Sequence, residues 1–289
     1  MTDRVESQGA KALKRAGLTA LTFLLMAAMC VPGLWVVLAA FRPNGEILAK
    51  PPVWIPEHPG LDNFGKIFGY GTDQVAIPVG AYFANSLIIA VTSTVIALAV
   101  GMAGGYAFAR FTFRGKGAVF LGLMLFRAVP GIALSLPVFI LWSRLGLIDT
   151  RLGLIIVYVS LNVPFTIWLI DGFFRQIPLS LSEAAQVDGC TRWQAFWKIE
   201  FPLARSGIAA AGVFAFLTSW NEFALASQLT RSTSSKTLPV GLLDFTAQFT
   251  IDWAGMCALA VIIIIPALIL TFLVQKHLIA GLTFGGVKG

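Results

Sequence analysis

Six stretches of this chain are long and almost free of charged side chains, and they limit its fold more than any other feature. They cover residues 17–41, 81–109, 118–143, 152–170, 206–230 and 254–275. A helix needs about 20 apolar residues to cross a bilayer. Only 12% of the residues are charged, against about 25% in soluble proteins, so most of the surface cannot face water. The sequence predicts an all-α polytopic membrane protein with six transmembrane helices.

We divide the chain into five parts, one of which contains the last five of these stretches. We expect a cytoplasmic N-terminal tail (1–16), a first transmembrane helix (17–41), an extracytoplasmic loop (42–80), a core transmembrane domain (81–280) and a cytoplasmic C-terminal tail (281–289). The first helix is expected to be retained, because it is longer than a signal-peptide core and lacks a clear small-residue cleavage site. The 42–80 loop is rich in proline and too short for a domain core, which favours a cap or a docking surface.

Basic residues set the orientation. Six spans place both termini on one side, where 13 Lys and Arg lie, against 7 on the other side and Arg127 within the third span. Positive charge collects on cytoplasmic loops, so both termini are predicted to be cytoplasmic. The same bias explains the net charge of +7, and no nucleic-acid partner is needed to account for it.

Cysteine and histidine give no catalytic or metal constellation. Cys30, Cys190 and Cys257 form no CxxC pair, and His58 and His277 fall on opposite sides of the expected membrane. We therefore expect a chain that is not an enzyme and that holds no cofactor or metal of its own.

The loop between the fourth and fifth spans contains helix-boundary signals. Ser180 and Glu183 have the spacing of a capping box, which predicts a helix start. Gly189 after Asp188 is placed to end that helix, because glycine adopts a left-handed conformation without a steric cost. Ala184 and Ala185 make the helix thin and suited to a groove on another protein. A generic amphipathic interfacial hairpin is the equal alternative.

A second short helix is predicted directly afterwards. Thr191 and Gln194 repeat the capping-box spacing, and the helix is expected to end before Pro202. Its apolar side chains are expected to lie against the ends of the membrane helices. They are Trp193, Phe196, Trp197 and Ile199.

This loop, residues 175–204, resembles the EAA loop of permeases from binding-protein-dependent ABC importers. The pattern EAA-x3-G-x9-I-x-L-P is matched by Glu183, Ala184, Ala185, Gly189, Ile199 and Pro202, with Phe201 in place of leucine. The resemblance implies that ATPase coupling runs through this loop. The residues assigned to coupling are Ser180, Glu183, Ala184, Ala185, Asp188, Gly189, Ile199 and Pro202.

Further segments are similar to the maltose-type carbohydrate branch of that family, at residues 60–64, 106–110, 220–223, 237–241 and 281–289. The resemblance implies a bacterial inner-membrane permease for a sugar or oligosaccharide. Its partners would be a second permease, two cytoplasmic ATPase subunits and an extracytoplasmic substrate-binding protein. The chain contains no G-x-x-x-x-G-K-[ST] motif, so ATP and Mg are expected on the partner ATPase.

A charge inside the bilayer costs at least about 2.5 kcal/mol, so polar residues within spans are pathway candidates. They are Arg127, Asn162, Trp220, Asn221 and Glu222. Arg127 has the alternative of an ion pair with an acid on another helix. Trp220 to Glu222, expected near the middle of the fifth span, could instead bond between helices. Asn162 with Pro164 could mark a simple bend.

Two alternatives to sugar import stay open at this point. They are an ABC permease for another small solute, and a polytopic transporter or membrane enzyme outside the ABC class. The sequence also leaves open whether the sugar is neutral or acidic. Ala97, Gly101 and Gly105 in the second span favour close helix packing, although glycine is also common in membrane helices.

Overall fold

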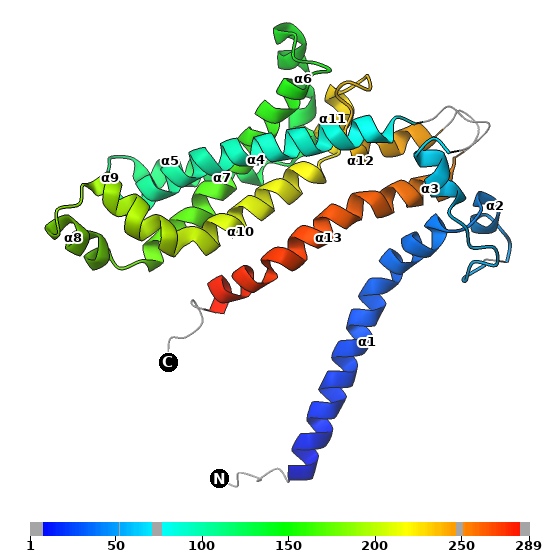
Figure 1. Ribbon diagram of the computed structural model, residues 1–289, viewed down its shortest axis with the longest axis horizontal. Helices are drawn as coiled ribbons and strands as arrows, with labels where there is room; N and C mark the ends of the chain where they lie inside the picture. The colour runs from blue at the N-terminus through cyan, green and yellow to red at the C-terminus, as the bar shows by residue number, and fades with distance from the viewer. Residues whose placement is uncertain (1–7, 52, 71–76, 247–250, 284–289) are drawn as a thin grey trace. The chain divides into compact units, whose positions relative to one another are not determined.

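The computed structural model describes residues 8–51, 53–70, 77–246 and 251–283, and nearly all of its regular elements in these ranges are helical (Figure 1). The chain forms two compact units. One contains Met1–Gln74 with Ala247–Val261, and the other contains Val75–Thr246 with Ile262–Gly289. The all-α prediction is confirmed.

The first unit consists of the long helix α1 (Gln8–Ala40), the short helices α2 (Asn44–Ile47) and α3 (Asp62–Ile67), and the start of α13 (Trp253–Thr283). Arg42 organises the segment after α1. Its guanidinium is buried, donates hydrogen bonds to the carbonyls of Val53 (2.6 Å) and Trp54 (3.2 Å), and lies 4.7 Å from the ring centre of Trp35. One arginine thereby fixes the course of a loop that has little apolar core.

The second unit carries the rest of the described helices, including the remainder of α13 (Figure 1). They are α4 (Val79–Arg110), α5 (Lys116–Ala128), α6 (Gly131–Leu145), α7 (Arg151–Gln176), α8 (Leu179–Val187), α9 (Arg192–Ala195), the π-helix Phe196–Glu200, α10 (Phe201–Trp220), α11 (Ala224–Leu229), α12 (Leu238–Gly241) and the 3-10 helix Leu242–Phe245. Because α4, α7 and α10 each run the length of this unit, loops gather at two ends. One end holds α8 and the other holds the turn at Asp149.

Helices α4 and α7 approach closely because glycines line the contact. A Cβ atom at Gly101 would overlap the side chain of Thr166, and one at Gly105 would lie 2.8 Å from Ile170. The sequence prediction of close packing at Gly101 and Gly105 is confirmed. In a membrane the lipid is as apolar as the helix surfaces, so the hydrophobic effect does not drive helices together. Small residues let the two backbones approach closely, and van der Waals packing then stabilises the helix pair.

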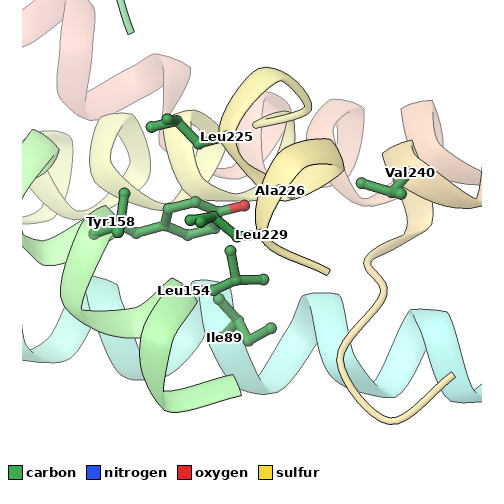
Figure 2. Packing of buried hydrophobic residues seen from close by; sticks show 8 residues of the cluster. Ile89, Leu154, Tyr158, Leu225, Ala226, Leu229 and Val240 are labelled. Carbon is green, nitrogen blue, oxygen red and sulfur yellow. The ribbon is translucent and has the colours of Figure 1, made fainter. Parts of the chain in front are cut away.

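Apolar side chains from four helices fill the core near the Asp149 end (Figure 2). Ile89 of α4 and Leu154 and Tyr158 of α7 pack together with residues of α11 and α12, here Leu225 and Val240. This cluster holds the short helices against the long ones.

Within the described residues, five helices are long and apolar enough to cross a membrane, and a sixth span requires two helices. The predicted third span, residues 118–143, is broken into α5 and α6 with a bend of 95°. The sequence predicted a span here but not this break. Pro130 cannot donate the helical hydrogen bond and holds Val129 in an extended conformation (φ −70°, ψ 125°), so the helix ends before it.

The predicted fifth span, residues 206–230, also differs. Helix α10 ends at Trp220 and α11 begins at Ala224, so residues 220–222 lie at a helix end and not near the middle of a span. Glu222 explains the restart. Its carboxylate accepts hydrogen bonds from the backbone amides of Leu225 (2.8 Å) and Ala226 (2.9 Å), which satisfies two of the free donors at the start of the new helix.

Candidate functional site: the α8 loop and the polar residues of the spans

Helix α8 begins at Leu179, and its N-cap is Pro178 without a side-chain cap. The predicted capping box of Ser180 and Glu183 is therefore wrong. Pro178, and not Ser180, sets the start of α8. It forces Ile177 into an extended conformation, which ends α7, and its own φ of −59° is already that of a helix start. Ser180 consequently lies inside the first turn with its side chain exposed.

The end of α8 follows the prediction. Gly189 has φ +89°, a left-handed conformation, and its amide donates to the carbonyl of Gln186 (3.1 Å). The amide of Cys190 donates to the carbonyl of Ala185 (2.9 Å), which completes a Schellman motif. The glycine stop at Gly189 is confirmed, and it fixes the direction of the chain after α8.

The second capping box is also confirmed. The amide of Thr191 donates to the Gln194 side chain (2.8 Å), and the amide of Gln194 donates to the Thr191 hydroxyl (3.2 Å).

The expected end of this helix before Pro202 was wrong. A π-helix from Phe196 to Glu200 carries the chain directly into α10, and the Pro202 ring falls in the first turn of α10, where a missing N–H is tolerated.

The outer face of the loop is open to a partner. Along α8 and its end, Ser180, Glu183, Ala184, Asp188 and Gly189 are exposed, and Ala185 is half-buried. Ile199 is half-buried in the π-helix and Pro202 is exposed at the start of α10. Apolar side chains share this surface: Val187 is 88% exposed and Trp193 is 68% exposed. The loop combines a rigid backbone with an unpartnered apolar and acidic surface.

A buried polar network beneath α8 was missed by the sequence analysis. Ser182, the only buried residue of α8, donates a hydrogen bond to Glu200 (2.7 Å). Glu200 also forms an ion pair with Arg110 (2.6 Å) and accepts a weak hydrogen bond from Tyr106 (3.3 Å). Arg110 donates in turn to the carbonyl of Ile177 (3.0 Å). The sequence does show Glu200 between two apolar residues, which could have marked it as buried. It does not show the hydrogen-bond partners of Glu200, because they lie far from it along the chain.

Arg127 lies at the end of α5, beside the break, with an exposed side chain. Its guanidinium contacts the carbonyl of Leu161 (3.4 Å) and lies 5.0 Å from the ring centre of Phe165 on α7. Among the residues that the structure describes, no carboxylate forms an ion pair with it. The alternative of an intrachain ion pair therefore finds no partner there.

Asn162 and Trp220 are buried and bonded within the helix bundle. The Asn162 amide donates to the Ser219 hydroxyl (2.9 Å), which also accepts a hydrogen bond from Ser93 (3.0 Å), so α4, α7 and α10 are linked. Trp220 is 1% exposed, and its indole N–H donates to the carbonyl of Ile263 (3.0 Å). Neither side chain is open to a solute in this conformation.

Glu222 and Asn221 differ in exposure. Besides the amides at the start of α11, Glu222 accepts a hydrogen bond from the Tyr158 hydroxyl (3.0 Å), so it joins α7 to α11. Asn221 is exposed at the end of α10. Of the five pathway candidates, Arg127 and Asn221 are thus the two with exposed side chains.

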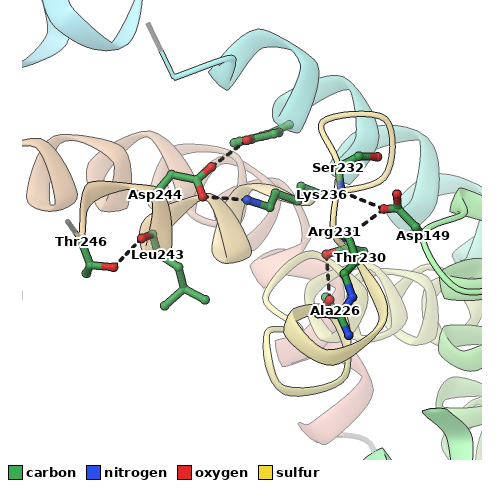
Figure 3. A network of polar contacts seen from close by, with 10 residues as sticks. Asp149, Ala226, Thr230, Arg231, Ser232, Lys236, Leu243, Asp244 and Thr246 are labelled. Atoms are coloured by element: carbon green, nitrogen blue, oxygen red, sulfur yellow. Dashed lines mark hydrogen bonds and ion pairs between the residues drawn. The ribbon is translucent and has the colours of Figure 1, made fainter. Parts of the chain in front are cut away.

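Asp149 organises the opposite end of the unit, where the α6–α7 turn meets the chain after α11 (Figure 3). It accepts hydrogen bonds from the amides of Arg231 (2.8 Å) and Ser232 (2.9 Å) and from the Ser235 hydroxyl. Burial raises the pKa of the Asp149 carboxyl, but the hydrogen bonds from Ser232, Ser235 and Arg231 outweigh it and hold the pKa well below its usual range. The carboxylate is ionised at neutral pH and fastens two loops.

A second polar group continues at the same end of the unit (Figure 3). Asp244 forms an ion pair with Lys236 (2.7 Å) and accepts a hydrogen bond from the Tyr82 hydroxyl (2.6 Å). The start of α4 is thereby tied to the segment after α12.

Comparison with known proteins places the chain in a family. Residues 101–283 match the model of the family described as "Binding-protein-dependent transport system inner membrane component". The chain is 33% identical to the diacetylchitobiose uptake system permease protein DasC of Streptomyces coelicolor, with 92% of this chain and 94% of that protein covered. It is 31% identical to the sulfoquinovosyl glycerol transport system permease protein SmoH of Agrobacterium fabrum, with 89% and 88% covered.

A solved structure supports the fold. A chain of a bacterial ABC transporter involved in the import of the acidic polysaccharide alginate matches with a TM-score of 0.74 at 22% identity, covering 93% of this chain and 98% of that one. The matched residues 101–283 include α8, the π-helix and the broken α5–α6 pair. This chain belongs to the family of inner membrane components of binding-protein-dependent transport systems, the multi-pass permease subunits of ABC importers.

Proposed function

We propose that this permease imports a sugar or oligosaccharide and is driven through α8 by a separate ATPase. The observation that carries this proposal is α8 itself. It is a nine-residue helix with a fixed end at Gly189, one buried side chain and an otherwise largely exposed surface. A partner that moves such a helix moves a rigid lever and not a flexible loop.

The partners follow from the family. We infer a second permease, two cytoplasmic ATPase subunits that bind ATP and Mg, and an extracytoplasmic substrate-binding protein. The α8 end then faces the cytoplasm together with both termini, and the Asp149 end faces outward. The excess of basic residues on the α8 side supports this orientation.

The solute surface is proposed to include Arg127 and the aromatic residues beside it. Phe165 lies 5.6 Å from both Trp168 and Phe214, measured between ring centres, so α5, α7 and α10 contribute to one cluster. Trp168 and Phe214 are nearly half exposed. A sugar ring stacks on such aromatic faces, while an unpaired guanidinium binds hydroxyl or carboxylate oxygens.

Lipid is a poor environment for this surface. Charged side chains in spans almost always face a water-filled cavity or the interior of a bundle. Thr218 lies one helical turn beyond Phe214 on α10, where it is half-buried and its hydroxyl donates a hydrogen bond to the Phe214 carbonyl (2.8 Å). Polar and aromatic groups therefore lie together, which favours a solute with both a ring face and oxygen acceptors, and an acidic sugar above a neutral one.

Transport by the complete complex tests this assignment. Proteoliposomes that contain the transporter and its binding protein would be assayed for uptake of a neutral probe, diacetylchitobiose, and an acidic probe, an alginate oligosaccharide, with and without vanadate. We expect vanadate-sensitive uptake. Arg127→Gln should reduce uptake of an acidic solute by about tenfold, because a charge-assisted hydrogen bond is lost, with a smaller effect on a neutral one.

Arg144→Gln is the matched control, since Arg144 is another exposed arginine at a helix end of the same unit. It should leave uptake unchanged. Uptake insensitive to vanadate would contradict the ABC assignment itself. Loss of the assembled complex in Arg127→Gln would instead show that Arg127 pairs with an acid of a partner subunit.

A further inference from the structure

The carboxylate of Glu200 joins three parts of the second unit at one point. Its side chain is 2% exposed, and that of its partner Arg110 is 7% exposed. Ser182 reaches it from α8, Arg110 and Tyr106 reach it from the end of α4, and Glu200 itself precedes α10. Arg110 adds a hydrogen bond to the carbonyl of Ile177, which lies between α7 and α8.

The π-helix explains how an acid occupies this position. A π-turn adds one residue to the helical repeat and changes the direction of the side chains that follow, and such turns recur at functional sites. Aromatic rings surround the point: Tyr106 lies 4.8 Å from Phe196 and 5.3 Å from Phe174, measured between ring centres. In this apolar setting each polar atom depends on its partners, because water cannot replace them.

The attachment of α8 is narrow. Ser182 is its only buried side chain, so the hydrogen bond to Glu200 is the principal buried link between α8 and the bundle. Arg110 and Glu200 remain paired with each other whether or not Ser182 bonds to them. The Ser182 hydroxyl can therefore be removed without leaving a buried charge unpaired.

We propose that Glu200 is a positioning residue that makes α8, α4 and the start of α10 move as one body. Displacement of α8 then travels along α4 to the opposite end, where Tyr82 of α4 bonds to Asp244 in the segment Leu242–Phe245. This inference rests on the proposed coupling function of α8. It adds the route by which that movement reaches the far end of the unit.

Fluorescent labels at the two ends test the route. The complete complex, in nanodiscs and with Cys30, Cys190 and Cys257 replaced by serine, would carry a bimane label at Val187→Cys on α8 or at Leu243→Cys at the far end. Both positions are exposed. Trapping with ATP and vanadate should change the fluorescence of both labels. In Ser182→Ala the label on α8 should still respond to trapping. The ratio of trapped to relaxed conformers, as reported by the label at Leu243→Cys, should fall roughly tenfold.

Two further variants separate positioning from folding. Ser182→Thr keeps the hydroxyl donor and should restore the response at the far end. Ser93→Ala removes another buried serine hydrogen bond, the one to Ser219, and should leave both responses intact. An unchanged far-end response in Ser182→Ala would overturn the route. Failure of Ser182→Ala to assemble would also overturn it, since the role would then be structural only. If neither label responds in the unaltered complex, the proposed coupling function fails instead.

Discussion

At the scale of single residues, much of the polar chemistry in this permease fastens elements together. Glu222 and Asn162 were candidates for contact with the solute, yet each bonds to a neighbouring helix. Arg127 differs, because its guanidinium contacts only a carbonyl and an aromatic ring among the described residues. Sequence alone located these residues, since a polar group in an apolar span is conspicuous. It could not distinguish their roles, because the partners come from other helices.

Asp149 gives a prediction about pH. Its pKa is lowered in the folded protein, so its contribution to stability is complete above the unfolded pKa of about 3.9 and is lost as pH falls toward the folded value. We expect the thermal unfolding temperature of the purified protein to fall below about pH 4. Asp149→Asn should lower stability at pH 7 by roughly 1–3 kcal/mol and flatten this pH dependence.

Asp188→Asn serves as the control for Asp149→Asn, because it removes an exposed carboxylate at the other end of the unit. Its unfolding temperature should follow that of the unaltered protein across the pH range. Equal pH profiles for Asp149→Asn and the unaltered protein would show that Asp149 does not carry the effect.

At the scale of elements, helix ends determined by neighbouring residues were predicted best. The glycine stop at Gly189 and the capping box at Thr191 depend on contacts within a few residues, and both are confirmed. The expected cap at Ser180 failed because Pro178 starts the helix earlier. The stop at Pro202 failed because a π-helix accommodates the ring, a choice made by packing around Phe196. Long-range pairs such as Arg110 with Glu200 leave no local pattern to read.

Gly189 provides a test of the lever. Both Gly189 and Gly172 have open space where a Cβ would be added, but only Gly189 has a positive φ. Gly189→Ala should cost about 1–2 kcal/mol through left-handed strain and reduce the number of solutes transported per ATP hydrolysed. Gly172→Ala, inside α7, should be neutral or slightly stabilising. Equal transport-to-hydrolysis ratios for the two variants would contradict a fixed bend after α8.

At the scale of the whole molecule, the count of spans and the orientation need different kinds of evidence. Among the described residues, hydropathy located four of the five long helices and placed the fifth, α10, too far along the chain. It could not show that the sixth span is a bent pair, because hydropathy carries no information on the direction of a helix axis. The proposed orientation rests on basic residues. A fusion of alkaline phosphatase to the C-terminus should be inactive, since the enzyme matures only after export, whereas a fusion after Arg231 should be active. The reverse result would refute the assignment of both termini to the cytoplasm.

The break between α5 and α6 bears on the electrical insulation of the membrane. At the end of α5 the Val129 amide donates to the Phe126 carbonyl, but Pro130 has no N–H to continue the helical hydrogen bonds, and residues 127–130 are exposed. Hydrocarbon cannot satisfy exposed backbone polar groups, so water or another protein surface must cover them. A continuous column of water would let ions run down the membrane potential. A transporter that wets this segment must therefore keep a second, closed barrier in series with it throughout its cycle.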